Sequence, residues 1–190
     1  MRLFFGLALP HGTRAAAAAL SALAQERIAG RYVPAENYHM TLAFLGDTPP
    51  EDVPRAGEVL ARCAAALPAP RLSPERPDVF GCMENGILVL RLASAPDLAP
   101  LHDALLSALR ASGLPATDGP FAPHITLARH AAASPQALLS LEREALRVPA
   151  FRPAHAHLYL SARDGAGILR YTPLLDAPFA PSLPSFDRGL

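Results

Sequence analysis

The sequence has few of the residues that mark several protein classes. It contains two cysteines, Cys63 and Cys82, and no tryptophan. Two cysteines are too few for the disulfide framework of a small secreted domain or for a four-cysteine zinc site. They suit a reducing compartment, and we therefore expect a cytoplasmic protein.

Neither sign of charge is in excess, because Lys+Arg and Asp+Glu both number 17. A protein that coats long nucleic acid usually carries a large basic surplus. Any nucleic-acid partner is therefore expected to be short, or to be held by one end in a locally basic cleft.

Long apolar runs and nucleotide-binding glycine loops are also missing. No stretch of 18 or more uncharged apolar residues occurs, so we expect no membrane span. Neither a phosphate-cradling loop nor a dinucleotide fingerprint is present. This argues against an enzyme that uses ATP or NAD, and no cofactor is expected.

The composition that remains is that of a folded domain. Hydrophobic residues make up 51% of the 190 residues and charged residues 18%, which is enough apolar material for a core. We expect a single domain over residues 1–176, and a loose proline-rich tail over residues 177–190. Nothing in the sequence requires more than a monomer.

One short pattern occurs twice. "HMTLAFLG" begins at His39 and "HITLAR" begins at His124, which is 85 positions later (124 − 39). Apolar periodicity and turn residues around each copy predict the same order: helix, His-x-Thr strand, helix, strand, strand. The sequence therefore predicts an α+β fold built from two pseudo-repeats, about 11–92 and 97–174. Pairing their mainly antiparallel sheets about a pseudo-two-fold axis would bring the two histidines face to face.

The strand period of two decides which side chains share a face. His39 and Thr41 point one way, and Met40, Leu42 and Phe44 are expected to point the other. His124 and Thr126 likewise share a face, which we expect to line a cleft while the apolar face packs against helices. Helix starts are expected at Thr13, Asp97 and Ser134.

Two histidines at one site can divide acid and base catalysis. An imidazole has an ordinary pKa of about 6.5, so one ring can donate a proton and the other can accept one near neutral pH. Threonine hydroxyls can donate hydrogen bonds to an anion between the rings. A phosphodiester attacked on one side and cleaved on the other fits this arrangement without a metal ion.

Four stretches, "RLFFGLALP", "ENYHMTLAFLG", "PFAPHITLAR" and "LYLSARDGAGILRYTPL", make the sequence similar to the 2H phosphoesterases. Within that superfamily it resembles the RNA 2′,3′-cyclic phosphodiesterases, also called 2′-5′ RNA ligases. The resemblance implies a bilobal fold with two sheets around a central cleft and helices on the outer faces. It also implies hydrolysis of 2′,3′-cyclic phosphate ends of RNA or nucleotides to 2′-phosphomonoesters.

The same resemblance assigns roles to individual residues. His39 corresponds to the general acid and His124 to the general base, while Thr41 and Thr126 bind the non-bridging phosphate oxygens. Arg129 corresponds to a phosphate contact. It lies five residues after His124, so a regular strand would turn it away from the cleft, and its role requires a bend.

The sequence leaves two roles for Phe44 and more than one function for the protein. Phe44 occupies the place in the first copy that Arg129 has in the second, and it can stack on a base or pack in the core. RNA-end binding or 2′-5′ end ligation at the same cleft is the main alternative function. A metal-dependent hydrolase that uses His155 and His157 is a third hypothesis, although no cysteine or acidic cluster nearby completes such a site.

Overall fold

The structure is a computed structural model that describes residues 1–93, 96, 98–117 and 119–181. The helices in this part are α1 (His11–Gln25), α2 (Val53–Ala65), α3 (Leu98–Ala111) and α4 (Pro135–Ala145), with 3₁₀ turns η1 (Ala35–Asn37) and η2 (Pro50–Asp52). The strands are β1 (Arg2–Ala8), β2 (Ala29–Tyr32), β3 (His39–Asp47), β4 (Ser73–Phe80), β5 (Gly86–Ala93), β6 (His124–Ala132), β7 (His155–Arg163) and β8 (Leu169–Pro178). The predicted α+β class and the repeated element order are both confirmed, and β2 is an additional strand.

The described strands form one antiparallel sheet in the order β4-β5-β6-β3-β1-β7-β8, with β2 paired to the side of β6. The two sheets expected from the sequence are thus joined. The connection is narrow, because β3 and β6 are paired only through Met40 and Ile125. On either side of this connection the strands form two separate groups.

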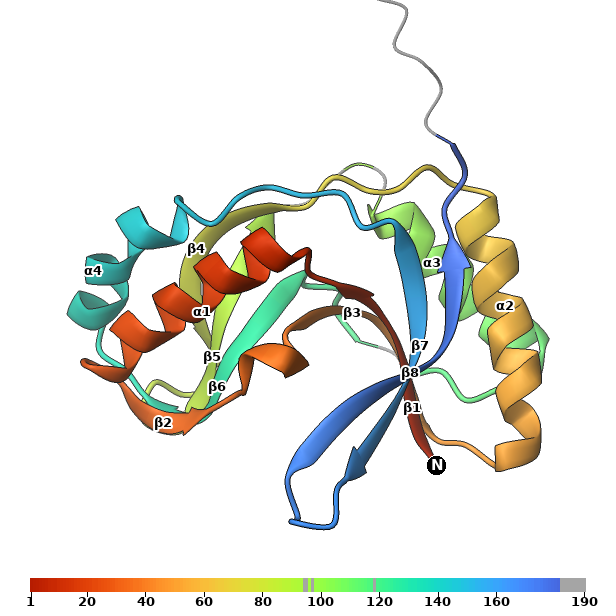
Figure 1. Cartoon of the computed structure of the whole chain (residues 1–190), viewed down its shortest axis with the longest axis horizontal. Helices are drawn as coiled ribbons and strands as arrows, with labels where there is room; N and C mark the ends of the chain where they lie inside the picture. Colours follow the sequence, from red (N-terminus) through yellow and green to blue (C-terminus); the bar gives the residue numbers. More distant parts are fainter. Residues whose placement is uncertain (94–95, 97, 118, 182–190) are drawn as a thin grey trace, which may run out of the picture.

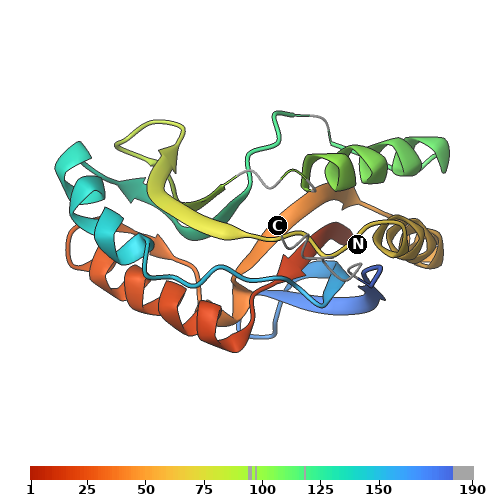
Figure 2. The same ribbon diagram turned by 90° about the horizontal axis from the view of Figure 1, so that it is seen from above.

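Each group of strands carries its own pair of helices, and we call each combination a lobe. One lobe contains β2, β4, β5 and β6 with α1 and α4, and the other contains β1, β3, β7 and β8 with α2 and α3. Figures 1 and 2 show the two helix pairs at opposite ends of the molecule. Each lobe therefore combines elements from both halves of the chain: the β4–β5 hairpin joins the second His-x-Thr strand, and the β7–β8 hairpin lies beside β1, next to the first.

The core is formed by the apolar faces of the central strands and the helices that cover them. On β1, the five residues from Leu3 to Leu7 are all buried, as expected for a central strand that is covered on both faces. Met40 and Ile125 are also fully buried at the junction of the lobes. Burying each such side chain contributes about 1.5–3 kcal/mol, so the junction is held by packing as well as by hydrogen bonds.

Helix starts and the C-terminal segment differ in part from expectation. Ser134 caps α4 by accepting a hydrogen bond from the Ala137 N–H, as predicted, whereas Thr13 lies inside α1 and its hydroxyl donates to the Pro149 carbonyl. The expected cap Asp97 and residues 182–190 of the expected tail lie outside the described residues. β8 continues to Pro178, and Ala177 is buried, so the packed structure extends beyond residue 176. No helix in the described segments has the length and apolarity needed to cross a bilayer.

Candidate active site

The pairing of Met40 with Ile125 places the four polar residues of the two motifs together. The strands β3 and β6 are antiparallel and are paired at Met40 and Ile125. Extending that register by one residue on each side sets His39 opposite Thr126 and Thr41 opposite His124. Met40 and Ile125 point into the core, so their sequence neighbours point to the other side. Each histidine thus lies diagonally across from the other and beside the threonine of the other strand.

Both His-x-Thr strands contain the same two irregularities. In the pairing of β3 with β1, Leu42 and Leu45 have no partner, and in the pairing of β6 with β5, Leu127 and His130 have none. Each pair is separated by the same 85 positions as the histidines (127 − 42 and 130 − 45). A β-bulge adds one residue to a strand and reverses the direction of the side chains that follow.

The bulges explain how residues five positions after each histidine reach the cleft. Leu42 and Ala43 are both buried in succession, and Phe44 emerges on the His39 side with 48% of its surface exposed. The expectation that Phe44 faces away from His39 is wrong for this reason. Arg129 is turned in the same way by the bulge at Leu127, which supplies the bend that its role requires.

Different donors satisfy the carbonyl groups of the two bulged leucines. The Leu42 carbonyl accepts a hydrogen bond from Nδ1 of the buried His102 on α3 at 2.6 Å. The Leu127 carbonyl accepts one from the backbone N–H of Val33, just after β2, at 2.8 Å. A buried carbonyl without a partner is destabilising, so these donors stabilise the bulges.

A cleft of about 650 Å³ contains every site residue expected from the two motifs. Its lining includes His39, Thr41, Phe44, His124, Thr126 and Arg129. Among the described residues that line the cleft there is no aspartate or glutamate, and four are arginines, namely Arg2, Arg31, Arg129 and Arg163. The chain has no net charge, so positive charge is concentrated here, which favours an anionic ligand.

His39 is held by its backbone and by aromatic rings. Its Nδ1 lies 2.7 Å from the carbonyl oxygen of Asn37, and its Nε2 lies 3.1 Å from the hydroxyl oxygen of Thr41. A carbonyl group only accepts, so Nδ1 carries the hydrogen, and Nε2 of the neutral ring keeps its lone pair for a proton. Phe4 and Tyr171 pack against the ring, each with a centroid separation of 4.8 Å.

His124 has the same backbone contact and a different environment. Its Nδ1 lies 2.7 Å from the carbonyl oxygen of Ala122, again two residues earlier, and its Nε2 is therefore also the free nitrogen. One aromatic ring, Phe80 on β4, meets it edge-on at 4.8 Å. Arg91 on the neighbouring strand β5 is directly opposite His124 in the ladder.

The electrostatic environment disfavours the protonated form of both rings in the free protein. Burial lowers the pKa of His39 to about 4, and the charges of His124 and Arg129 add to this effect. Burial also lowers the pKa of His124, with further contributions from Arg91 and Arg129. Both rings are therefore mainly neutral near pH 7, and a bound anion would favour the uptake of a proton.

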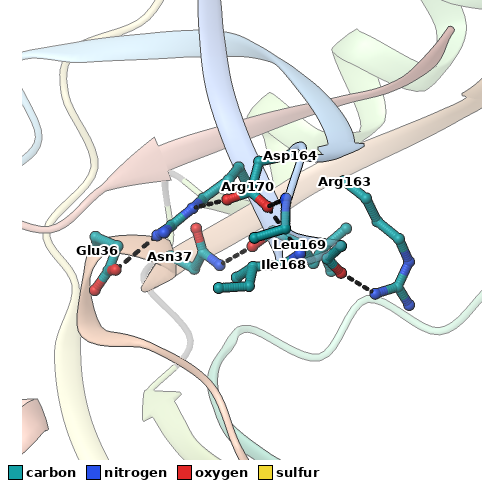
Figure 3. Close-up of polar contacts among 9 residues, drawn as sticks. Glu36, Asn37, Arg163, Asp164, Ile168, Leu169 and Arg170 are labelled. Carbon is teal, nitrogen blue, oxygen red and sulfur yellow. Dashed lines mark hydrogen bonds and ion pairs between the residues drawn. The ribbon is translucent and has the colours of Figure 1, made fainter.

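The β7–β8 hairpin is tied to the segment that precedes His39. The buried side chain of Asn37 donates a hydrogen bond to the Leu169 carbonyl at 2.8 Å. Arg170 bridges Glu36 and Asp164 at 2.8 and 3.1 Å. Figure 3 shows these contacts side by side at the base of the hairpin turn. Asn37 thus connects the hairpin to His39 through its side chain and its carbonyl group.

Sequence reasoning did not identify Asn37, Phe80, Tyr171 or Arg31 as parts of this site. Asn37 and Tyr171 lie in the stretches that carry the family resemblance, which is the signal that pointed toward them. Phe80 and Arg31 lie on β4 and β2, which are distant in sequence from the second motif. Only the order of strands in the sheet brings these two residues to the cleft.

His155 and His157, the residues of the metal hypothesis, lie on β7, and the cleft lining does not include them. His157 Nδ1 is 2.7 Å from a carboxylate oxygen of Asp176, and the ring centroids of the two histidines are 6.3 Å apart. Within the described ranges, no group of three or more histidine, cysteine or acidic side chains is placed to hold a metal ion.

Solved structures of bacterial proteins have the same fold. A crystal structure from Thermus thermophilus matches with a TM-score of 0.74 at 27% identity, covering 94% of this chain and 98% of the other. Escherichia coli LigT in complex with 3′-AMP matches with a TM-score of 0.72 at 30% identity, covering 94% of this chain and 97% of the other.

Sequence comparisons point to the same group of proteins. An RNA 2′,3′-cyclic phosphodiesterase of Thermus thermophilus is 35% identical over 146 residues, which is 72% of each chain. The protein of that name from Escherichia coli is 32% identical over 178 residues, covering 91% of this chain and 93% of the relative. The family model of the 2′-5′ RNA ligase superfamily matches residues 13–165. With the paired His-x-Thr strands on one cleft, these matches show that the chain belongs to the 2′-5′ RNA ligase superfamily.

Proposed function

We propose that the protein hydrolyses 2′,3′-cyclic phosphate ends of RNA or nucleotides to 2′-phosphomonoesters. The observation that carries this proposal is that the histidine and threonine of both motifs line one arginine-lined cleft, with their two strands paired at Met40 and Ile125. The names of the two sequence relatives support the choice of substrate, as do the complexes of Escherichia coli LigT with phosphate and with 3′-AMP.

In the proposed mechanism the cyclic phosphate lies between the two imidazoles. Nε2 of neutral His124 accepts a proton from water, and the water oxygen forms a bond to phosphorus. The bond between phosphorus and the 3′ oxygen breaks on the opposite side, where Nε2–H of protonated His39 donates a proton to the departing oxygen. Proton transfer of each kind contributes about 10²–10⁴-fold in rate.

The remaining polar groups act on the charge of the phosphate. The hydroxyl groups of Thr41 and Thr126 donate to its non-bridging oxygens, and the Arg129 guanidinium offsets its negative charge. Phe44 offers a partly exposed ring on which a base can stack. Because both histidines are mainly neutral in the free protein, the negative phosphate raises their pKa values, and the proton that His39 donates is taken up when substrate binds.

Joining of RNA ends is the second candidate function. If the 5′-hydroxyl group of another RNA takes the place of water, the same proton transfers form a 2′-5′ linkage. The match to the 2′-5′ RNA ligase superfamily favours this alternative. Product analysis on a cyclic-ended RNA, with and without a 5′-hydroxyl partner strand, separates ligation from hydrolysis and from simple end binding.

The test of hydrolysis is an assay with adenosine 2′,3′-cyclic phosphate in the presence of a chelator, with the product isomer identified. We expect turnover to adenosine 2′-phosphate that is abolished by His39→Ala or His124→Ala. Turnover that persists in both variants, or that disappears in chelator alone, would contradict the mechanism. The chelator arm also tests the rival hypothesis of a metal site at His155 and His157.

The organisation and location of the protein belong to the same proposal. We propose one bilobal domain made of two pseudo-repeats, acting as a monomer in the cytoplasm. The matching offsets of the histidines and the bulges support the repeats, and the free thiols of Cys63 and Cys82 support a reducing location. Size-exclusion chromatography with light scattering tests the oligomeric state.

A further inference from the structure

Arg31 and Arg129 lie directly opposite each other at the edge of the cleft. Arg31 on β2 is the ladder partner of Arg129 on β6, and both side chains line the cleft. Opposite residues of an antiparallel pair share a face and have Cβ atoms about 4.5–5.5 Å apart. The two guanidinium groups therefore project side by side into one space.

In the described part of the chain, Arg31 and Arg129 lack the negatively charged partners that other arginines have. Arg55, Arg147 and Arg170 form ion pairs with carboxylates, whereas no hydrogen bond or ion pair of Arg31 or Arg129 occurs among the residues the structure describes. The part of the cleft lining that the structure describes also contributes no carboxylate. Like charges directly opposite each other are destabilising in a sheet, so the arrangement is favourable only when an anion lies against both.

Arg129 and Arg31 differ in how they relate to the two histidines. Arg129 follows His124 on β6, and its charge is among those that lower the pKa of both His39 and His124. Arg31 lies on β2, the short strand paired to the edge of β6, and that strand carries neither motif. Arg129 can thus contact the reacting phosphate, which leaves Arg31 beside it for a second anionic group.

We propose that Arg31, together with Arg129, forms a subsite for a second phosphate, namely the phosphodiester of the RNA chain that adjoins the reacting end. Guanidinium groups bind phosphate oxygens through paired, charge-assisted hydrogen bonds. The subsite makes the protein prefer cyclic-ended oligonucleotides to cyclic mononucleotides. This inference rests on the proposed function and names the substrate class within it.

The experiment compares adenosine 2′,3′-cyclic phosphate with an adenylate dinucleotide that ends in a 2′,3′-cyclic phosphate. The ratio of kcat/KM for the two substrates is measured for the unaltered protein and for Arg31→Gln. We expect the dinucleotide to be preferred, and Arg31→Gln to lower kcat/KM for the dinucleotide about tenfold, as expected for one charge-assisted contact. Turnover of the mononucleotide should stay unchanged.

Three further variants sharpen the result. Arg31→Lys keeps the charge without the planar fork and should retain part of the preference. Arg27→Gln removes an equal charge outside the cleft lining and should leave the ratio unchanged. Arg2→Gln removes a charge from another part of the lining and should also leave it unchanged, because β1, on which it lies, belongs to the other lobe.

Salt dependence provides a second measurement. Salt screens the attraction between a guanidinium group and a phosphate, so kcat/KM for the dinucleotide should fall as the salt concentration rises. Arg31→Gln should weaken this salt dependence for the dinucleotide and leave it unchanged for the mononucleotide. The melting temperature should not fall, since the substitution removes a repulsion.

Several outcomes would overturn the subsite. An equal loss on both substrates would place Arg31 on the reacting phosphate, and no loss on either would remove it from RNA binding. If Arg2→Gln, and not Arg31→Gln, abolishes the preference for the dinucleotide, the RNA chain runs toward Arg2. If Arg31→Gln affects only ligation, Arg31 binds the RNA strand that supplies the 5′-hydroxyl group. Failure of the unaltered protein to hydrolyse either substrate would instead contradict the proposed function.

Discussion

His39 and His124 make the same backbone hydrogen bond, yet their surroundings differ. Each ring donates Nδ1–H to the carbonyl group two residues earlier, and each strand carries bulges at the same offsets. Around His39 lie Phe4 and Tyr171, and Asn37 links it to the β7–β8 hairpin. Around His124 lie one aromatic ring and the guanidinium groups of Arg91 and Arg129.

The comparison shows which parts of a repeated motif are shared and which distinguish its two copies. The strand, its bulges and the His-Thr pair set the shared geometry. The two copies differ in residues that occupy equivalent positions, 85 apart in the sequence. Asn37 corresponds to Ala122, Phe44 to Arg129 and Ala17 to His102 (122 − 37, 129 − 44 and 102 − 17). Exchanging these residues between copies tests whether the neighbours assign the acid and base roles.

The largest expected effect separates acid from base. His39→Ala and His124→Ala should each reduce kcat by about 10²–10⁴-fold on a cyclic phosphate. On a phosphodiester with a para-nitrophenolate leaving group, which needs no proton, the loss in His39→Ala should shrink and the loss in His124→Ala should persist. The measurement is steady-state kinetics on both substrates, with His130→Ala as the control. The opposite pattern would exchange the roles.

Arg129→Phe places on β6 the residue that β3 has at the equivalent position, which is Phe44. Loss of the charged contact to phosphate should lower kcat/KM by about 10–100-fold. It should also raise the pKa of His39 from about 4 and that of His124, because the Arg129 charge lowers both. The optimum of kcat/KM, which we expect below pH 6.5, should then move upward. NMR titration of the imidazoles measures this directly, and an unchanged His39 pKa would contradict the placement of Arg129.

Asn37→Ala gives the segment before β3 the residue that stands at the equivalent position before β6, Ala122. Without the amide, the Leu169 carbonyl loses its donor, and the peptide that orients His39 loosens, so kcat should fall on the order of tenfold with little change in KM. Stability should fall by about 1 kcal/mol. Glu36→Gln is the matched control, because it removes only an exposed ion pair with Arg170. Equal effects of both substitutions would argue against a positioning role of Asn37.

His102→Ala tests the support of the first bulge and should affect stability more than catalysis. It leaves the Leu42 carbonyl without its donor, which should reduce the free energy of unfolding by about 1–3 kcal/mol. Urea denaturation measures this loss, and kcat should change less than in Asn37→Ala. His102→Gln retains an N–H donor and should recover part of the stability. If His102→Ala is as stable as the unaltered protein, the bulge does not depend on this bond.

Local pattern was sufficient to predict much of the fold and the four central site residues. Alternation predicted that β3 and β6 turn His39, Thr41, His124 and Thr126 to one side, and the repeated order of elements predicted the helices around them. These features depend on the period of each element, which the sequence states directly.

The features that could not be predicted depend on partners distant in sequence. The Leu42 carbonyl accepts its hydrogen bond from His102, and the Leu127 carbonyl accepts one from Val33; neither partner is recognisable from the motif. β2 has only four residues and no buried side chain, and it forms because β6 offers an edge. The same pairing places Arg31 in the cleft. The joining of the sheets rests on Met40 and Ile125, whose pairing no local pattern specifies.

The crossed assembly of the lobes has a consequence for synthesis of the protein. The lobe that carries His39 needs β7 and β8 to complete its sheet, and β8 ends at Pro178. A nascent chain therefore lacks a finished cleft until β7 and β8 have left the ribosome. Both histidines are synthesised well before the sheet that surrounds them is complete.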